Sequence, residues 1–139
     1  MKTLILALIL SSSVYSAQTN HRIVSGKSAT TIHVSPSNEV ILGKHSEMSL
    51  LQDFVELVKG KAHFAVKAEM KVQAPEVSFT TSAAEFDVVI TQDSVDLHVL
   101  TGQVEASSPH IQSFVPEVVS AKQHLRYSKK LRQFIRLKK

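Results

Sequence analysis

The stretch Val55-Glu56-Leu57-Val58-Lys59-Gly60-Lys61-Ala62-His63-Phe64-Ala65-Val66 shows the pattern on which the fold class rests. After Gly60, the side chains of Ala62, Phe64 and Val66 share one side of an extended chain, because successive residues of a strand point to opposite faces. The residues between them share the other side. We therefore predict two strands, each with one buried face, flanking a glycine that supplies the positive φ of a tight turn or bulge.

Alternation of this kind continues along most of the chain from residue 30 onward, and helical periodicity is scarce before the C-terminus. The predicted strands are Thr30–Val34, Glu39–Leu42, Met48–Leu51, Phe54–Val58, Ala62–Ala68, Val77–Thr81, Glu85–Thr91, Val95–Leu100, Gln103–Ala106, Ile111–Val115 and Val118–Tyr127. Residues that favour turns separate these runs. The spacing predicts an all-β sandwich, barrel or stacked solenoid, because no segment is long enough to be a crossover helix between parallel strands.

One internal similarity has two interpretations. Residues 55–62 align with residues 97–104 at an offset of 42, so that the apolar positions and the glycines Gly60 and Gly102 coincide. The similarity indicates either two copies of one strand-turn-strand unit or two similar hairpins of a sandwich, since two copies are fewer than a repeat architecture needs.

The first seventeen residues have the pattern of a secretory signal, with Lys2 at the start, an apolar run over Thr3–Leu10 and small residues up to Ala17. The run is about half of the ~20 residues that a membrane-spanning helix needs, so we expect cleavage, after Ser16 in preference to Ala17. The expected organisation is a signal peptide (1–17), a linker (18–29), one all-β domain (30–128) and a basic tail (129–139), located in the periplasm or secreted.

Charge is divided unevenly along the chain. Residues 19–121 hold seven basic and twelve acidic side chains, whereas residues 122–139 hold eight basic and no acidic ones. This division argues against a basic domain surface for nucleic acid and indicates a tail with its own electrostatic role. The chain contains no cysteine, which excludes disulfides, thiolate metal sites and a cysteine nucleophile.

The tail also has an apolar pattern, because Tyr127, Leu131, Phe134 and Ile135 recur at i, i+4, i+7 and i+8. That spacing predicts a basic amphipathic helix. Such a helix either binds an anionic membrane or polysaccharide surface, or packs on the domain or stays frayed. The candidate residues for contact with an anionic surface are Lys129, Lys130, Arg132, Arg136, Lys138 and Lys139.

The other polar groups indicate structural roles. His63 and His98 fall on the polar faces of predicted strands, and we interpret them as solvated residues rather than metal ligands. Asp87, Asp93, Asp96 and Glu105 fit no calcium loop, and we expect Asp93 to stabilise its own turn. No serine lies in a nucleophile-elbow pattern. We expect no enzymatic activity, no cofactor and no metal.

The alternation and the glycines together resemble the FecR family. The segment quoted first matches the family pattern Val-x-Leu-x-x-Gly-x-Ala-x-Phe-x-Val, and further similarity lies at Glu39–Leu42, Val77–Thr81, Ala83–Val88, Leu97–Val104 and Ser120–Tyr127. The chain departs from the family at three places, where Ser37-Asn38, Ala83-Ala84 and Lys122 replace usual glycine-containing positions. Each replacement loses the conformational freedom that a glycine gives to a turn.

The resemblance implies a solenoid-like, non-enzymatic domain that acts outside the cytoplasm through protein contact, in envelope signalling. Family members usually add a cytoplasmic segment that binds a sigma factor, and a membrane span. We expect neither in this chain, so a direct anti-sigma role is not carried over. A protein partner is expected and nucleic acid is not. The alternative is a structural envelope protein held to an anionic surface by its basic tail.

Overall fold

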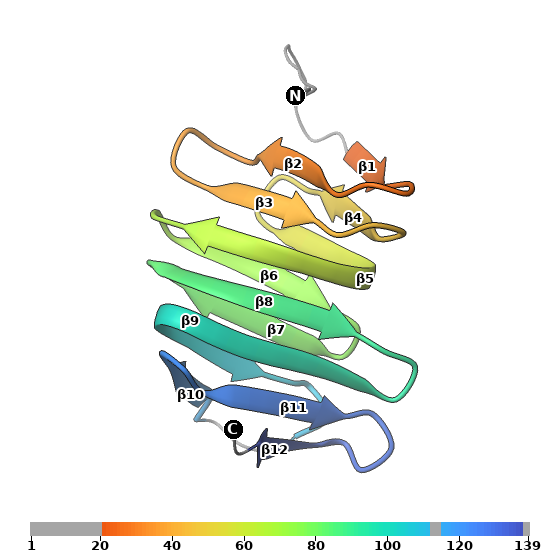
Figure 1. The fold of residues 1–139 in the computed structure, drawn as a ribbon. Coiled ribbons are helices and arrows are strands. Elements are labelled where there is room, and N and C mark those ends of the chain that lie inside the picture. Colours follow the sequence, from red (N-terminus) through yellow and green to blue (C-terminus); the bar gives the residue numbers. More distant parts are fainter. Residues whose placement is uncertain (1–20, 112–114, 138–139) are drawn as a thin grey trace.

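The computed structural model describes residues 21–111 and 115–137, and this part of the chain is built from strands (Figure 1). The strands are β1 (His21–Val24), β2 (Thr30–His33), β3 (Glu39–Leu42), β4 (Glu47–Leu50), β5 (Val55–Val66), β6 (Met70–Ala74), β7 (Val77–Thr81), β8 (Ala84–Ile90), β9 (Ser94–Ser107), β10 (Glu117–Ser120), β11 (His124–Ser128) and β12 (Gln133–Leu137). The predicted all-β class is confirmed.

The centre of the molecule is a small barrel. Strand β5 pairs with β8, β8 with β9, β9 with β7, and β7 with β6, all antiparallel. A short parallel pairing of β6 with β5, at Val55↔Val72 and Glu56↔Gln73, closes the circuit. The solenoid-like or sandwich-like description was therefore too loose, because long strands that belong to both walls join them into a barrel.

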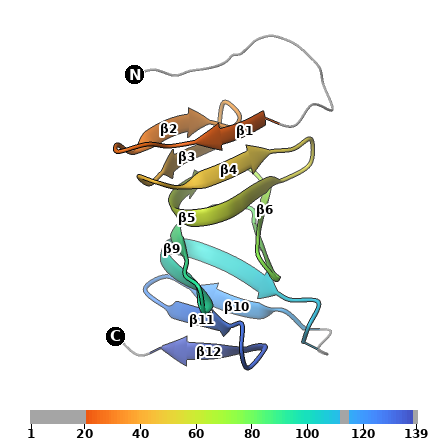
Figure 2. The same ribbon diagram turned by 90° about the vertical axis from the view of Figure 1, so that its right-hand side faces the viewer.

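Extra strands extend the barrel at both ends (Figures 1 and 2). On one wall, which we call sheet C, the order is β2-β3-β5-β8-β9-β11-β12. On the other wall, sheet B, the pairings give the order β1-β4-β5-β6-β7-β9-β10. The β5 and β9 strands each pass from one sheet to the other.

Both long strands bend at a glycine. Gly60 in β5 has a φ of 89° and Gly102 in β9 a φ of 80°, and each lies where its strand changes sheet. The pairing register slips beside each glycine, so that Val58 and Leu100 lack opposite partners. The two segments offset by 42 residues therefore have the same local geometry, a bulge followed by a bend, although the strands continue through the glycines instead of turning back.

The alternating apolar residues fill the space between the two sheets. The largest buried side chains include Phe64, Phe79, Phe86 and Tyr127. Phe64 and Phe86 lie opposite each other in β5 and β8, with stacked rings whose centroids are 5.0 Å apart. The inward faces predicted for these strands are thus the faces that pack. Burial of such aromatic pairs supplies much of the energy that stabilises a small all-β core.

The predicted C-terminal helix is wrong. Residues 133–137 form β12, which pairs with β11, and residues 129–132 form the turn between them. Tyr127 and Phe134 lie opposite each other across this hairpin, with ring centroids 5.5 Å apart at 66°. The helix-like spacing arises because a turn inserted between two short strands also places apolar residues at intervals of about three and four.

Several other strand predictions are corrected by the pairing. The predicted runs around Gly60 and Gly102 are single strands, and the run Val118–Tyr127 is divided into β10 and β11 by a turn. Strand β6 was missed, and β1 lies within the expected linker (18–29). In the predicted strand Ile111–Val115, residues 112–114 lie outside the described residues, and Ile111 and Val115 are in bends.

The predicted signal peptide (1–17) also lies outside the described residues. Among residues 21–111 and 115–137, the structure has no helix that is long and apolar enough to cross a membrane.

Candidate functional site

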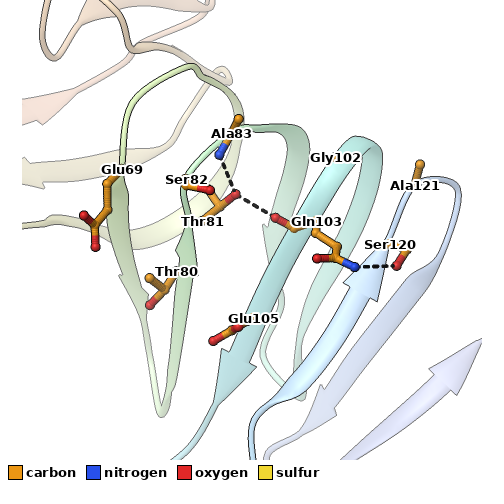
Figure 3. A pocket seen from close by; sticks show the side chains of 10 residues that line it. All are labelled: Glu69, Thr80, Thr81, Ser82, Ala83, Gly102, Gln103, Glu105, Ser120 and Ala121. Carbon is orange, nitrogen blue, oxygen red and sulfur yellow. Dashed lines mark hydrogen bonds between the residues drawn. The ribbon is translucent and has the colours of Figure 1, made fainter.

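An open groove of about 700 Å³ lies on the outer side of sheet B, beside the line where strands pass between the sheets (Figure 3). The β7 and β9 strands pair only as far as Thr80↔Glu105 and then diverge. The groove lies at this divergence. Its walls come from the ends of β7 and β10, the bend of β9, the turn before β8 and the connection before β6. The lining residues are Glu69, Thr80, Thr81, Ser82, Ala83, Gly102, Gln103, Glu105, Ser120 and Ala121.

Thr81 and Gly102 fix the shape of the groove. The buried Thr81 hydroxyl donates to the carbonyl oxygen of Gln103 at 2.6 Å and accepts from the amide of Ala83 at 3.2 Å. A side chain thereby links β7 to β9 where the backbone pairing ends (Figure 3). A Cβ atom at Gly102 would lie 2.8 Å from the Cα of Ala84, so only glycine lets the β7–β8 turn approach this closely.

The chemistry of the groove suits a polar surface contact. Glu69 and Glu105 supply carboxylates, and Thr80, Ser82 and Ser120 supply hydroxyls. The lining contains no lysine, arginine, histidine or aromatic side chain. Sites for small ligands are mostly apolar and enclosed, whereas this groove is open and is lined mainly by polar residues, as in the rim of protein interfaces. Sequence reasoning missed the groove, because it is formed by segments that are far apart in the sequence, from Glu69 to Ala121.

The outer backbone edges of the end strands are a second kind of surface that a partner could bind, but side chains cover the edge of β10. The side chain of Gln123 accepts from the amide of Ser120 at 2.8 Å, and the guanidinium of Arg136 donates to the carbonyl of Val118 at 2.8 Å. Arg136 also bonds Glu117 at 2.9 Å. These side chains occupy backbone groups that a partner strand would need, so strand addition at β10 is blocked.

The predicted anionic-surface residues are divided between two roles. Arg136 is bound to Glu117, and the ammonium group of Lys129 donates to the carbonyl of Thr91 at 2.8 Å. Lys130 and Arg132 are exposed in the β11–β12 turn. Lys138 and Lys139 lie outside the described residues. The basic end of the chain is thus held in part by the acidic body, as the bidentate pair Arg126–Asp96 also illustrates (2.8 and 3.1 Å).

The carboxylates considered as a calcium group are not assembled into one site. Asp87 contacts His63 and Asp96 contacts Arg126 on sheet C, whereas Glu105 lies on sheet B. The turn after β8 is stabilised by Thr91, whose hydroxyl accepts from the amides of Asp93 and Ser94, and not by the Asp93 side chain as predicted. No group of three or more ligand-type side chains suited to a metal ion occurs within the described part of the chain.

The comparisons with known proteins show the fold. No family model matches the chain, and no curated protein matches it. Two crystal structures from Parabacteroides distasonis ATCC 8503, each described as a "putative anti-sigma factor", are similar to it. One has a TM-score of 0.71 at 16% identity over 87% of this chain, and the other 0.72 at 19% over 86%. The chain spans 61% and 60% of their lengths.

Proposed function

We propose that the chain is a FecR-like, non-enzymatic binding module, located in the periplasm or secreted, that acts in envelope signalling by contacting another protein. The observation that carries this proposal is the fold shared with the two Parabacteroides structures over nearly nine tenths of the chain. The words anti-sigma factor in their descriptions denote a regulator that binds a protein. The match covers only part of those proteins, so the module's role is proposed as binding and not as sigma-factor inhibition.

Local geometry supports the FecR resemblance independently of the comparisons. Lys122 replaces a usual glycine of the family pattern, and it has a φ of 69° in the β10–β11 turn. A glycine would adopt this left-handed conformation without strain, which accounts for a family preference at that position. Gly60 and Gly102, which the pattern does retain, bend the strands that build the barrel.

We place the protein contact at the groove on sheet B. A groove at the divergence of β7 and β9 can accept side chains of an extended segment, and its hydroxyl and carboxylate groups offer hydrogen bonds along its length. With Glu69 and Glu105 in the lining, a partner segment with basic side chains is favoured electrostatically. The covered edge of β10 directs a partner toward the groove and away from strand addition next to it.

Affinity purification from an envelope extract of the source organism tests this proposal. The bait is the tagged mature protein, compared with a Thr80→Arg variant in the groove and a matched Thr31→Arg control on the outer face of sheet C. We expect one protein to be retained by the wild type and the control and lost with Thr80→Arg. Retention of no specific protein would refute the binding function, whereas equal retention by all three baits would refute only the groove.

The alternative, attachment to an anionic surface, is retained in a changed form. Its amphipathic helix is replaced by the β11–β12 hairpin, in which Tyr127 and Phe134 pack against each other. The exposed Lys130 and Arg132, with the neighbouring Lys129, still form a compact basic turn at one end of the molecule. Contact through such a turn would be electrostatic and sensitive to salt.

A further inference from the structure

His63 lies between two carboxylates on the outer face of sheet C. Its Nδ1 is 2.6 Å from an oxygen of Asp87 and its Nε2 is 2.8 Å from an oxygen of Glu85. His63 belongs to β5, and both acids belong to β8, its partner strand. The His63 side chain is 26% exposed, and the side chains of Glu85 and Asp87 are 46% and 40% exposed. These groups are outside the groove and have no role in the proposed binding site.

This geometry is that of a charged imidazolium. A neutral imidazole donates through one nitrogen only, and its other nitrogen presents a lone pair, whereas the imidazolium donates through both. A lone pair facing a carboxylate at this distance is repulsive, so, with Asp87 and Glu85 both ionised, the two contacts persist together only while His63 carries its second proton. Partial burial lowers the pKa of His63, but the hydrogen bonds and charges of Asp87 and Glu85 outweigh it and raise the pKa above its ordinary value of 6.5.

The three groups belong to a row that crosses the sheet. In register, Ile41 (β3), His63 (β5), Asp87 (β8), His98 (β9), His124 (β11) and Leu137 (β12) lie side by side. The rings of His98 and His124 are stacked with centroids 5.4 Å apart. The other charged or titratable groups on the strands of this face are His33 on β2, Glu39 on β3, Lys61 on β5, and the Asp96–Arg126 pair on β9 and β11. Asp87 therefore has an imidazole on each side.

We propose that this row makes the outer face of sheet C a pH-responsive surface, in which protonated His63 holds Glu85 and Asp87 together and deprotonated His63 releases one of them. Glu85 is the group released, because its side chain is longer, more exposed and farther from the ring than that of Asp87. Loss of the proton changes the net charge of the trio from −1 to −2 and frees a carboxylate. Because the pKa is raised in the folded state, the link is complete below pH 6.5 and is lost as the pH rises through the raised pKa.

NMR titration of the full chain tests the proposal. The ring signals of His63 and the carboxyl carbon of Glu85 are followed from pH 5 to 9 in the wild type and in the variants Glu85→Gln, Asp87→Asn and His63→Gln. We expect His63 to titrate above 6.5, the Glu85 signal to shift with the same midpoint, and each acid substitution to lower the His63 midpoint. His33→Gln is the matched control, since His33 lies 3.8 Å from Glu39 in an edge hairpin of the same sheet.

Each outcome of the titration either supports or overturns the proposal. A Glu85 shift that follows the His63 midpoint in the wild type and in His33→Gln, and disappears in His63→Gln, supports the proposal. A His63 midpoint at or below 6.5, or a Glu85 signal that does not respond when His63 titrates, overturns it. The wild-type titration alone decides the matter if a variant fails to fold.

Discussion

Replacement of Gly60 by alanine tests whether the bend of β5 is required for the barrel. The backbone φ at this position is 89°, a conformation that residues with a Cβ atom rarely adopt. An added Cβ would also lie 2.5 Å from the Cβ and 2.8 Å from the Cα of Ser46. Ser46 cannot easily move away, because its hydroxyl accepts from the amide of Lys61 and donates to the carbonyl of Lys44, both at 3.0 Å.

Two costs add up in this variant. A left-handed backbone conformation costs a residue with a Cβ about 1–2 kcal/mol. Forcing an extra methyl group into packed surroundings costs about 1–3 kcal/mol more. We therefore expect Gly60→Ala to lower the free energy of unfolding by about 2–5 kcal/mol, a large part of the roughly 5–15 kcal/mol that a domain of this kind possesses.

Urea denaturation followed by far-UV circular dichroism measures this loss. The matched control is Gly26→Ala, because a Cβ at Gly26 meets no atom within 4 Å and its φ is not positive. We expect the control to change the free energy of unfolding by less than about 0.5 kcal/mol. Gly102→Ala, at the equivalent bend of β9, should behave like Gly60→Ala. If Gly60→Ala were as stable as Gly26→Ala, the bend would not be a constraint and the reasoning would fail.

Three further substitutions follow from the contacts. Asn38→Ala removes the side-chain oxygen that accepts hydrogen bonds from the amides of Lys67 and Ala68 at 2.9 and 3.1 Å. We expect this variant to lower the free energy of unfolding, measured by urea denaturation, by about 2–4 kcal/mol. The control Ser37→Ala, at an exposed neighbouring position, should lower it little. Arg136→Gln removes the hydrogen bonds that join β12 to β10, and should lower the free energy of unfolding by under about 1 kcal/mol and speed hydrogen exchange of the β12 amides. The control Arg132→Gln should leave this exchange unchanged. Unchanged exchange in Arg136→Gln would contradict a stabilising role for these bonds. The anionic-surface alternative predicts that changing Lys129, Lys130 and Arg132 together to glutamine reduces sedimentation of the protein with anionic liposomes. The binding free energy should weaken by roughly 1 kcal/mol per residue at low salt. Equal sedimentation of the variant and the wild type would refute this alternative.

The alternation of apolar and polar residues was sufficient to predict the bounds of a strand where that strand has one buried face and lies between clear turns. Strands β3 and β7 begin and end where the pattern predicted. Strand β6 has the same pattern in Met70, Val72 and Ala74, all buried, so its signal was present and was overlooked. The glycine positions were located correctly, and of the two interpretations, a tight turn or a bulge, the structure has the bulge. A positive φ alone does not reveal whether a strand reverses or continues into a second sheet.

The remaining errors come from long-range pairing. The apolar spacing at the C-terminus fits a helix as well as a hairpin, and only the contact between Tyr127 and Phe134 across β11 and β12 distinguishes them. His63 was placed correctly on a polar face, but its contacts with Glu85 and Asp87 depend on the register between β5 and β8, which the sequence does not specify. The groove likewise depends on where β7 and β9 stop pairing.

Site-specific photo-crosslinking in living cells tests the central claim most directly. A photoreactive phenylalanine analogue replaces Thr80 in the groove or, in a parallel strain, Thr31 on the outer face of sheet C. A binding module that uses the groove gives a discrete crosslinked adduct with one envelope protein from position 80 and none from position 31. Adducts from neither position, or the same adduct from both, would contradict recognition of a protein through this surface.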